Sequence, residues 1–433
     1  MSSAIATPGD ATTDLVDPSR PRQRRTLRLC TAGSVDDGKS TFVGRLLHDT
    51  KNILADQYDA VKATSEARGQ EDVDLSLLVD GLRAEREQGI TIDVAYRYFA
   101  TDVRSFILAD CPGHEQYTRN TVTGMSTAEA VVLLIDARHG VVTQTRRHAT
   151  VAALLGIRHI VFAVNKIDLV DFDESIYRQI ESDALALAGR LELGSVHVVP
   201  ASAKQGDNIV DRSANTPWYE GPSVLELLEN FDIASDKNED ASLPLRLPID
   251  FVIRDYETEY RGYAGRIAAG SVAVGDTVEV NGGSTATVTA ISIAGDEAQS
   301  ASVGQSVSVS LDSEFDLARG DLIAVNAPQK TRRFTATAVH LADAPLAVGR
   351  VVEVRYGPAL VRGRISSVDA LIDIETGDST GSTDQLKVND VAEITVELAA
   401  DLEIEPYRTG GRVGAFLLVE PGTGDSLTAG LVK

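Results

Sequence analysis

Eight residues near the start of the chain have the types and spacing of a phosphate-binding loop. Residues 33–40 are GSVDDGKS, which fits G-x-x-x-x-G-K-[ST], between a short apolar run and a segment with helical periodicity. Glycines let backbone N–H groups turn toward phosphate oxygens, and the following helix adds a favourable dipole. A fortuitous Gly-rich turn is the alternative, which this context disfavours. The expected nucleotide-binding residues are Gly33, Ser34, Val35, Asp36, Asp37, Gly38, Lys39, Ser40 and Thr41.

Two side chains of this loop have particular expected roles. Lys39 is expected to reach the β- and γ-phosphates, and the Ser40 hydroxyl to ligate Mg²⁺. The loop alone does not distinguish ATP from GTP.

The tetrapeptide NKID at 165–168 supplies groups that could select the base. It follows the apolar run 160–164. The Asp168 carboxylate can accept hydrogen bonds from guanine N1–H and the 2-amino group, whereas adenine would leave the carboxylate unpaired. Asn165 can bond the other edge of the base, and the Lys166 stem can lie across its face.

A second short segment after the next apolar run supports the same base. Ser202, Ala203 and Lys204 suit backbone contacts to guanine O6 and a lysine stem packed on the ring. The two segments together predict GTP.

Residues 110–114, DCPGH, follow another apolar run and could sense the γ-phosphate. Asp110 could hold Mg²⁺ through water, and the Gly113 amide could bond the γ-phosphate. His114 is placed to orient the attacking water, as a glutamine does in other GTPases, although a lone histidine is usually structural. We expect His114 to be the catalytic residue.

The segment REQGITI at 86–92 could supply a further Mg²⁺ ligand. Thr91 would ligate the ion only in the GTP state. The alternative is a plain loop between a helix and a strand. The presence of the other four GTPase motifs, at 33–40, 110–114, 165–168 and 202–204, disfavours it.

The remaining histidines and the two cysteines do not indicate a second chemistry. Cys30 is expected in the core, and Cys111 as a small buried side chain rather than a redox sensor. None of the other histidines has a metal-binding spacing, so we predict no metal beyond Mg²⁺; they are residues 48, 139, 148, 159, 197 and 340.

Around these motifs, short apolar runs alternate with longer helical stretches, as in βαβ units on a parallel sheet. The expected strands are 26–32, 105–109, 131–136, 160–165 and 196–200. The expected helices are 39–48, 143–155, 175–191 and 223–230.

The pattern changes after the polar, acidic segment 232–243, which we expect to be a linker. Period-2 runs separated by Gly-Asp and Gly-Gly turns follow, at 277–280, 285–293, 303–311 and, after a break at 326–331, up to 413–419. The fold class expected is an α/β P-loop GTPase domain, mostly parallel with helices on both faces, followed by two small antiparallel β-barrels. The expected bounds are a mobile tail at 1–24 and domains at 25–238, 243–328 and 331–433.

Composition restricts the function classes. A formal net charge of −23 disfavours a protein whose main task is to hold nucleic acid. No run of 18 apolar residues and no signal peptide occur, so we expect no membrane span. Two cysteines suit a reducing cytoplasm.

The chain resembles the family of sulfate adenylyltransferase subunit 1. The resemblance rests on LLVDGLRAEREQGITIDVAYRYF at 77–99, on the segment from DCPGH to TQTRRH at 110–148, and on LLGIRHIVFAVNKIDLVDFD at 154–173. Elongation factors of the 1-alpha and Tu type share the domain order but usually carry H-x-D-H-G-K in the P-loop. Cys111 departs from the commoner Thr, at a position that contributes mainly backbone.

This resemblance implies a heteromer that makes adenosine 5′-phosphosulfate and pyrophosphate from ATP and sulfate. A separate catalytic subunit would perform the adenylyl transfer, which agrees with the lack of an H-x-G-H motif here. GTP hydrolysis would drive the reaction forward. We expect no fused product kinase, since no second P-loop occurs, and slow hydrolysis by the chain alone, since no arginine finger in cis is evident.

Two other function classes remain open at this point. One is an elongation-factor-type translational GTPase, which the acidic balance and the VDDGK and TQTRRH features disfavour. The other is a nucleotide-dependent scaffold with a vestigial site, which His114 and Thr91 disfavour.

Overall fold

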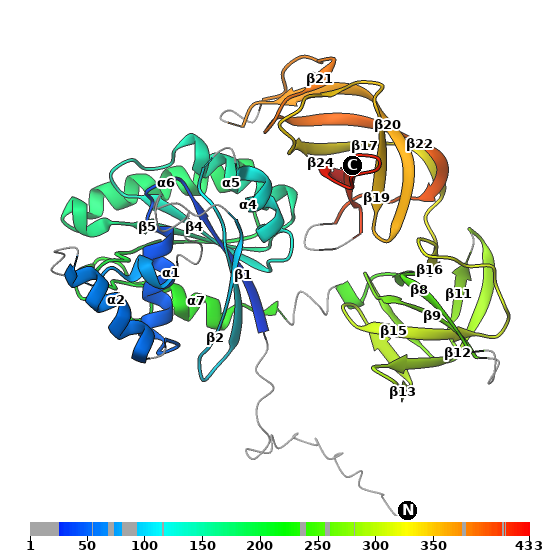
Figure 1. Cartoon of the computed structure of the whole chain (residues 1–433), viewed down its shortest axis with the longest axis horizontal. Helices are drawn as coiled ribbons and strands as arrows, with labels where there is room; N and C mark the ends of the chain where they lie inside the picture. The colour runs from blue at the N-terminus through cyan, green and yellow to red at the C-terminus, as the bar shows by residue number, and fades with distance from the viewer. Residues whose placement is uncertain are drawn as a thin grey trace, which may run out of the picture.

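The structure is a computed structural model of the chain (Figure 1). It describes residues 26–53, 55–67, 73–79, 93–114, 117–233, 240–255, 260–280, 282–374, 378–408, 411 and 413–433. The expected tail at 1–24 and the segment 86–92 lie outside these residues.

The first part of the chain forms a six-stranded sheet with the order β2-β3-β1-β4-β5-β6. Five strands run parallel, and β2 pairs antiparallel with β3 at one edge. The strands are β1 Thr26–Gly33, β2 Ala95–Ala100, β3 Ser105–Asp110, β4 Ala130–Asp136, β5 His159–Asn165 and β6 Ser195–Pro200. Because β1, β3, β4 and β5 run parallel, their carboxyl ends meet at one edge, where ligand sites form in such sheets.

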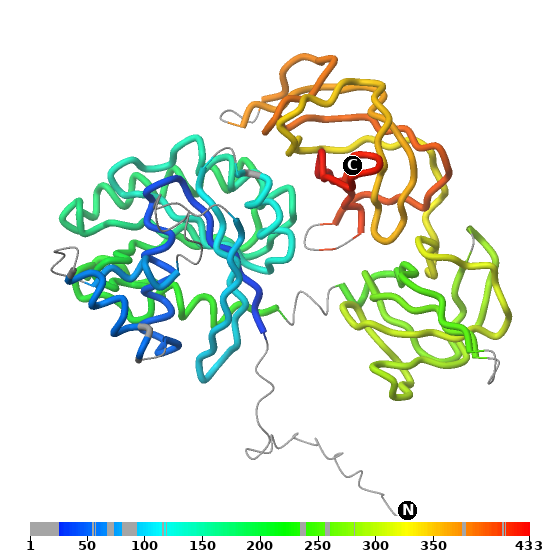
Figure 2. Tube along the Cα trace, viewed as in Figure 1, coloured from blue at the N-terminus to red at the C-terminus, as the bar shows by residue number. Residues whose placement is uncertain are grey.

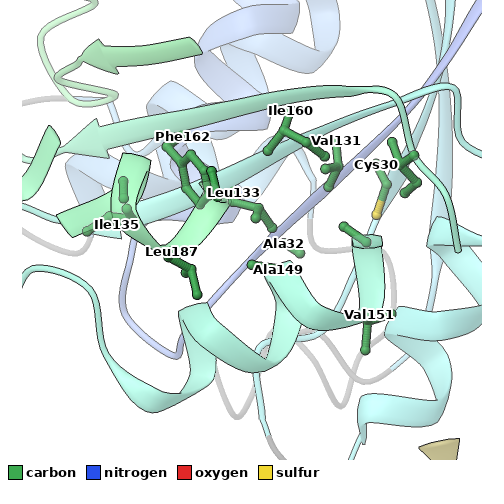
Figure 3. Packing of buried hydrophobic residues seen from close by; sticks show 14 of the residues in the cluster. Cys30, Ala32, Val131, Leu133, Ile135, Ala149, Val151, Ile160, Phe162 and Leu187 are labelled. Carbon is green, nitrogen blue, oxygen red and sulfur yellow. The ribbon is translucent and has the colours of Figure 1, made fainter. Parts of the chain in front are cut away.

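Helices cover both faces of this sheet, as Figure 1 shows. Side chains of β4 alternate between two cores, with Val131, Leu133 and Ile135 in one and Ala130, Val132 and Leu134 in the other. The first core includes residues of α4, α5 and α6, and is drawn in Figure 3. The second includes residues of α1 and α7. The helices are α1 Lys39–Asp49, α2 Ala55–Ala67, α4 Thr118–Met125, α5 Thr143–Leu154, α6 Glu174–Arg190 and α7 Val224–Asn230, with 3₁₀ turns η1 Leu75–Leu78 and η3 Ile167–Val170.

Two sequence motifs explain where helices begin. Asp173 caps α6 by accepting hydrogen bonds from the amides of Ser175 and Ile176. Ser223 and Glu226 form a reciprocal capping box at the start of α7.

An antiparallel eight-stranded sheet follows in the chain. Figure 2 traces the path of the chain through this part, in green to yellow. The main order is β7-β16-β11-β12-β15-β9-β8, with β13 paired to β12. An isolated bridge joins Arg246 of β7 to Ala269, just beyond β9, so the sheet curls back on itself. Its strands are β7 Arg246–Pro248, β8 Phe251–Asp255, β9 Tyr260–Arg266, β11 Thr277–Val280, β12 Ser284–Ile293, β13 Asp296–Ala298, β15 Ser306–Leu311 and β16 Leu322–Ala324; β10 Ser271–Ala273 pairs separately with β14 Ser300–Ser302.

The last part of the chain is a closed barrel with the order β17-β22-β20-β19-β23-β24. Its strands are β17 Lys330–His340, β19 Val351–Tyr356, β20 Ala359–Ile372, β22 Val391–Glu403, β23 Ala415–Val419 and β24 Ser426–Val432; β18 Leu346–Ala347 pairs with β21 Gln385–Leu386 beside it. The expected fold class, a P-loop domain followed by β-barrels, is confirmed. The domain bounds given above stay predictions.

One expected strand is partly wrong. Residues 303–311 do not form one strand, because β15 begins only at Ser306. Gly304 has a φ of +86° and lies in a turn closed by the hydrogen bond from Gln305 N–H to the carbonyl of Ser302. Strand β14 therefore ends before this turn.

A nearly buried ion pair joins the eight-stranded sheet to the chain segment after β22. The Nε and Nη2 atoms of Arg246 lie 2.5 and 3.1 Å from the two carboxylate oxygens of Glu405. The same guanidinium donates to the carbonyls of Leu245, Val325 and Asn326. Only 8% of the Arg246 side chain is exposed, so these partners, rather than water, stabilise its buried charge.

We expect Arg246→Ala to lower the free energy of unfolding by about 3 kcal/mol, because Glu405 would be left charged, enclosed and unpaired. Arg332→Ala is the control, since Arg332 forms a similar two-bond pair with Asp401 but is exposed. That variant should lose less than about 1 kcal/mol. Equal losses in urea unfolding would contradict the role assigned to Arg246.

Candidate nucleotide-binding site

The phosphate-binding loop connects β1 to α1. Gly38, directly before the helix, has a φ of +89°, and an added Cβ would lie 2.5 Å from the Asn165 amide nitrogen. Both facts require glycine here. The Lys39 side chain is only 8% exposed, and its Nζ lies 3.1 Å from the carbonyl of Gly33 and 2.7 Å from that of Ser34. Burial lowers the pKa of Lys39, while Asp110 and Asp37 oppose this shift. The loop thus holds a desolvated cation where phosphate would approach.

The Asp37 side chain stabilises the phosphate-binding loop by a hydrogen bond inside it. Its carboxylate accepts a hydrogen bond of 2.5 Å from the Ser34 amide, and the side chain is buried. Burial raises the pKa of Asp37, against the attraction of Lys39. The bond closes a short ring inside the loop and so limits its conformations.

The segment after β3 lies against this loop. An added Cβ on Gly113 would come within 2.3 Å of Lys39 Nζ and 2.8 Å of the Gly33 carbonyl, so only glycine allows this approach. Asp110, 1% exposed, accepts a hydrogen bond of 2.9 Å from the Thr31 hydroxyl. His114 follows Gly113 directly and is half-buried. The predicted γ-phosphate residues Asp110 and Gly113 therefore do lie beside the predicted phosphate loop.

The residues present suit a hard divalent cation. Ser40 lies in the first turn of α1 and Asp110 ends β3, so one hydroxyl and one carboxylate come from neighbouring elements. Oxygen ligands of this kind, completed by phosphate and water, are those that Mg²⁺ prefers. Among the described residues, no group of three or more His, Cys, Asp or Glu could hold a metal by itself. The third predicted ligand, Thr91, lies outside the described residues.

Asn165 connects the phosphate end of the site to the expected base end. Its amide nitrogen donates to the Asp37 carbonyl at 2.7 Å, and its amide oxygen accepts from Ala203 N–H at 2.8 Å. The residue is 1% exposed. Its side chain therefore fixes the segment 202–204 relative to the phosphate loop.

Lys166 is held by a buried carboxylate that the sequence did not indicate. Its Nζ donates to the Asp36 carbonyl and lies 3.0 Å from Asp136, which ends β4 and whose side chain is 1% exposed. Asp136 also accepts from Arg138, at 3.0 Å from Nε and 2.6 Å from Nη2. Burial alone would raise the pKa of Asp136, but hydrogen bonds from Arg138 and Lys166 outweigh it and hold that pKa well below its usual value. Asp136 thus stays ionised and positions two cations.

A cavity of about 1220 Å³ opens beside these groups. Predicted site residues that line it are Gly38, Thr41, Asn165, Lys166, Asp168, Ala203 and Lys204. Its wall also includes residues that the sequence did not indicate, from α1, α2, η1 and the residues before it, η3, and the segments that follow β4 and β6: Arg45, His48, Tyr58, Val73, Asp74, Leu75, Arg138, Leu169 and Gln205. Arg138 could have been suspected, since it follows the carboxyl end of a central strand.

The two cysteines meet in the core next to this site. Cys30 Sγ and Cys111 Sγ lie 3.2 Å apart, both side chains are fully buried, and neither forms a disulfide. Burial, together with the hydrogen bond to Cys111, raises the pKa of the Cys30 thiol. An added Cβ on Gly124 of α4 would lie 2.3 Å from Cys111 Sγ, so glycine makes room for the sulfur. The expected burial of both residues is confirmed.

We expect neither thiol to react with an aromatic disulfide reagent in the folded protein, because both side chains are fully buried and burial disfavours the Cys30 thiolate. The rate should be on the order of 10²-fold or more below that of an exposed thiol. Leu185→Cys, on an exposed position of α6, supplies that exposed reference. Fast reaction of the native cysteines would contradict the burial of this pair.

The arrangement of a phosphate loop, a facing D-x-P-G segment and an N-K-x-D strand end defines a P-loop GTPase. Two known families match: the Elongation factor Tu GTP binding domain over residues 24–235, and the GTP-eEF1A C-terminal domain-like family over residues 333–433. Among solved structures, Sup35 complexed with GDP matches with a TM-score of 0.42 and 24% identity, over 97% of both chains.

Curated relatives are similar over nearly the whole chain. Sulfate adenylyltransferase subunit 1 of Laribacter hongkongensis is 44% identical over 421 residues, which is 96% of this chain and 86% of the relative. The protein of the same name from Cellvibrio japonicus is 45% identical, over 95% and 87%. The bifunctional enzyme CysN/CysC of Mycobacterium tuberculosis is 46% identical, over 94% and 67%. The chain belongs to the sulfate adenylyltransferase subunit 1 family.

Proposed function

We propose that this chain is the GTPase subunit of a heteromeric sulfate adenylyltransferase. GTP hydrolysis here drives the formation of adenosine 5′-phosphosulfate and pyrophosphate from ATP and sulfate by a partner catalytic subunit. The observation that carries the proposal is the 44% identity to a subunit 1 protein over 96% of the chain. The assembled phosphate loop and strand ends support it, since Asn165 joins the phosphate-binding and base-binding groups of a GTPase into one site.

The site residues divide into a phosphate end and a base end. Backbone groups of residues 33–41 surround the phosphates, with Lys39 on the β- and γ-phosphates and the Gly113 amide on the γ-phosphate. Ser40, Asp110 through water and Thr91 hold Mg²⁺, which shields phosphate charge when bound. Asp168 accepts from the guanine N1–H and 2-amino groups, beside Asn165 and Lys166. The other base contacts come from Ser202, Ala203 and Lys204.

Coupling GTP hydrolysis to adenylyl transfer supplies free energy that the transfer lacks. A phosphosulfate anhydride lies well above its precursors, so adenylyl transfer to sulfate alone runs backward. GTP hydrolysis drives this step only if both reactions depend on the same conformational states of the complex. The nucleotide and the substrates of adenylyl transfer must each change the populations of these states. The segments around Thr91 and at 110–114 would transmit this bias, because the γ-phosphate is present in one state and absent in the other.

The partner is the catalytic subunit, and the compartment is the cytoplasm. The name subunit 1 of the relatives supports a heteromer. In the part of the chain that the structure describes, no helix is long and apolar enough to cross a membrane. The two cysteines are unpaired thiols, as a reducing compartment would leave them.

Replacing His114 with Ala is expected to reduce hydrolysis by about 10²–10³-fold while GTP affinity changes less than about threefold, because a water-orienting group acts mainly in the transition state. Single-turnover hydrolysis and equilibrium binding measure the two effects separately. His197→Ala is the control, since His197 is half-buried as His114 is but lies within β6 and does not line the cavity. Unchanged turnover in the His114 variant would assign water orientation to another group.

A translational GTPase is the second candidate, because the Elongation factor Tu GTP binding domain matches residues 24–235. GTP hydrolysis by the purified chain, measured with the catalytic subunit or with ribosomes, separates the two. We expect the catalytic subunit with ATP and sulfate to accelerate hydrolysis, and ribosomes to have no effect. Acceleration by ribosomes alone would favour the translational function.

A further inference from the structure

Arg45 of α1 reaches a part of the site that lies far from it in the sequence. Its Nε donates to the Ala203 carbonyl at 3.1 Å, and its Nη2 donates to the Lys204 carbonyl. The guanidinium therefore donates to two consecutive carbonyls of the segment that we expect to contact guanine O6. Its planar fork suits this arrangement, because two donors leave it in fixed directions.

Neighbouring side chains hold Arg45 in place. Its Nη1 lies 3.4 Å from the Asp49 carboxylate, one turn along α1, and Asp49 lies 2.6 Å from His48 Nδ1. Only 19% of the Arg45 side chain is exposed. An added Cβ on Gly206 would lie 3.4 Å from the Asp49 carboxylate and 3.7 Å from Arg45 Cδ, and Gly206 has a φ of +96°. Residue 206 thus lies beside Arg45 and Asp49, and its positive φ rather than a lack of space favours glycine.

The contact complements the bond that Asn165 makes. Asn165 holds the N–H of Ala203, and Arg45 holds its carbonyl and that of Lys204, so this part of the segment is fixed from both sides of its backbone. The two restraints come from different elements, β5 and α1. Since α1 begins at Lys39 and Ser40, the same helix carries groups for the phosphates and fixes the segment for the base.

We propose that Arg45 is a positioning residue for guanine recognition. It holds residues 203–204 where a backbone N–H of this segment can donate to guanine O6. The inference rests on the proposed GTP site and deepens it. Arg45 lines the cavity but acts through the segment that it fixes, not by contact with the reacting atoms.

The test uses the full chain with Arg45→Lys, which keeps the charge but cannot span both carbonyls. We expect its Kd for GTP to rise roughly 10–100-fold, because small displacements of a positioning group have effects of this size. The turnover number at saturating GTP should change less than about twofold, so that the loss appears in KM. Asp49→Asn should weaken GTP binding in the same direction but less. Arg178→Lys is the matched control, since Arg178 is an exposed helical arginine paired with Glu174 and Glu181.

6-Thioguanosine triphosphate identifies the contact affected, because it keeps the N1–H and the 2-amino group but carries sulfur, a weaker hydrogen-bond acceptor, in place of O6. If Arg45 acts through guanine O6, the Arg45→Lys change should weaken binding of this analogue less than threefold. Binding of GTP and of ITP, which keep O6, should weaken by the whole of the expected roughly 10–100-fold. An equal loss for all three nucleotides would overturn the inference and leave Arg45 a general structural role. So would unchanged GTP binding by Arg45→Lys. If wild-type protein did not prefer GTP over ATP, the proposed GTP site itself would fail, and the two failures are therefore distinguishable.

Discussion

Replacing Lys39 with Ala is expected to weaken GTP binding on the order of 10³-fold and to remove measurable hydrolysis. The Lys39 ammonium is enclosed by the phosphate loop and lies next to Gly113, where the γ-phosphate is expected. Loss of one partner of an enclosed charge pair costs about 2–5 kcal/mol, and each 1.4 kcal/mol is tenfold in affinity. Equilibrium binding of a fluorescent GTP analogue measures the change.

Lys62→Ala is the matched control, since Lys62 lies exposed on α2. It should bind and hydrolyse GTP as the wild type does. GTP affinity of the Lys39 variant within tenfold of the wild-type value would mean that the phosphates bind elsewhere.

Replacing Asp168 with Asn is expected to weaken GTP binding by roughly 10²-fold and to strengthen binding of xanthosine triphosphate. The carboxylate accepts from two guanine donors, and charged hydrogen bonds of this kind contribute about 1.5–3 kcal/mol each. Xanthine has a 2-oxo group where guanine has an amino group. An amide presents one acceptor and one donor, which match xanthine N1–H and O2.

Competition between the two nucleotides for the same variant measures this change of preference. Asp183→Asn, at an exposed position of α6, should leave the preference for GTP unchanged. An Asp168 variant that still prefers GTP would remove Asp168 from base recognition.

The central strands could be predicted because burial on both faces leaves a continuous apolar run. Every residue of β4 and β5 is buried, and the expected runs at 131–136 and 160–165 begin one residue late. The edge strand β2 was missed, since AYRYFA alternates between exposed and buried side chains and pairs on one side only. Helix α4, TRNTVTGM, was missed as well, because threonine and glycine obscure its helical pattern.

The site was predictable where chemistry is local in the sequence. Phosphate loops and strand-end tetrapeptides have fixed spacing, so Lys39 and Asn165 could be named directly. Arg45 and Asp136 could not, because their roles come from tertiary contacts: Arg45 and Ala203 are separated by 158 positions. An arginine on a helix or an aspartate at a strand end has no distinctive motif until the fold brings its partners together.

The proposed coupling is tested most directly by the amount of adenosine 5′-phosphosulfate that accumulates. The chain and the catalytic subunit are mixed with ATP and sulfate, with either GTP or a non-hydrolysable GTP analogue, until product formation stops. We predict that GTP raises the final level well above that reached with the analogue, and that the Lys39→Ala chain abolishes the difference. An identical final level with GTP and with the analogue would contradict the coupling, because hydrolysis would then contribute no driving force.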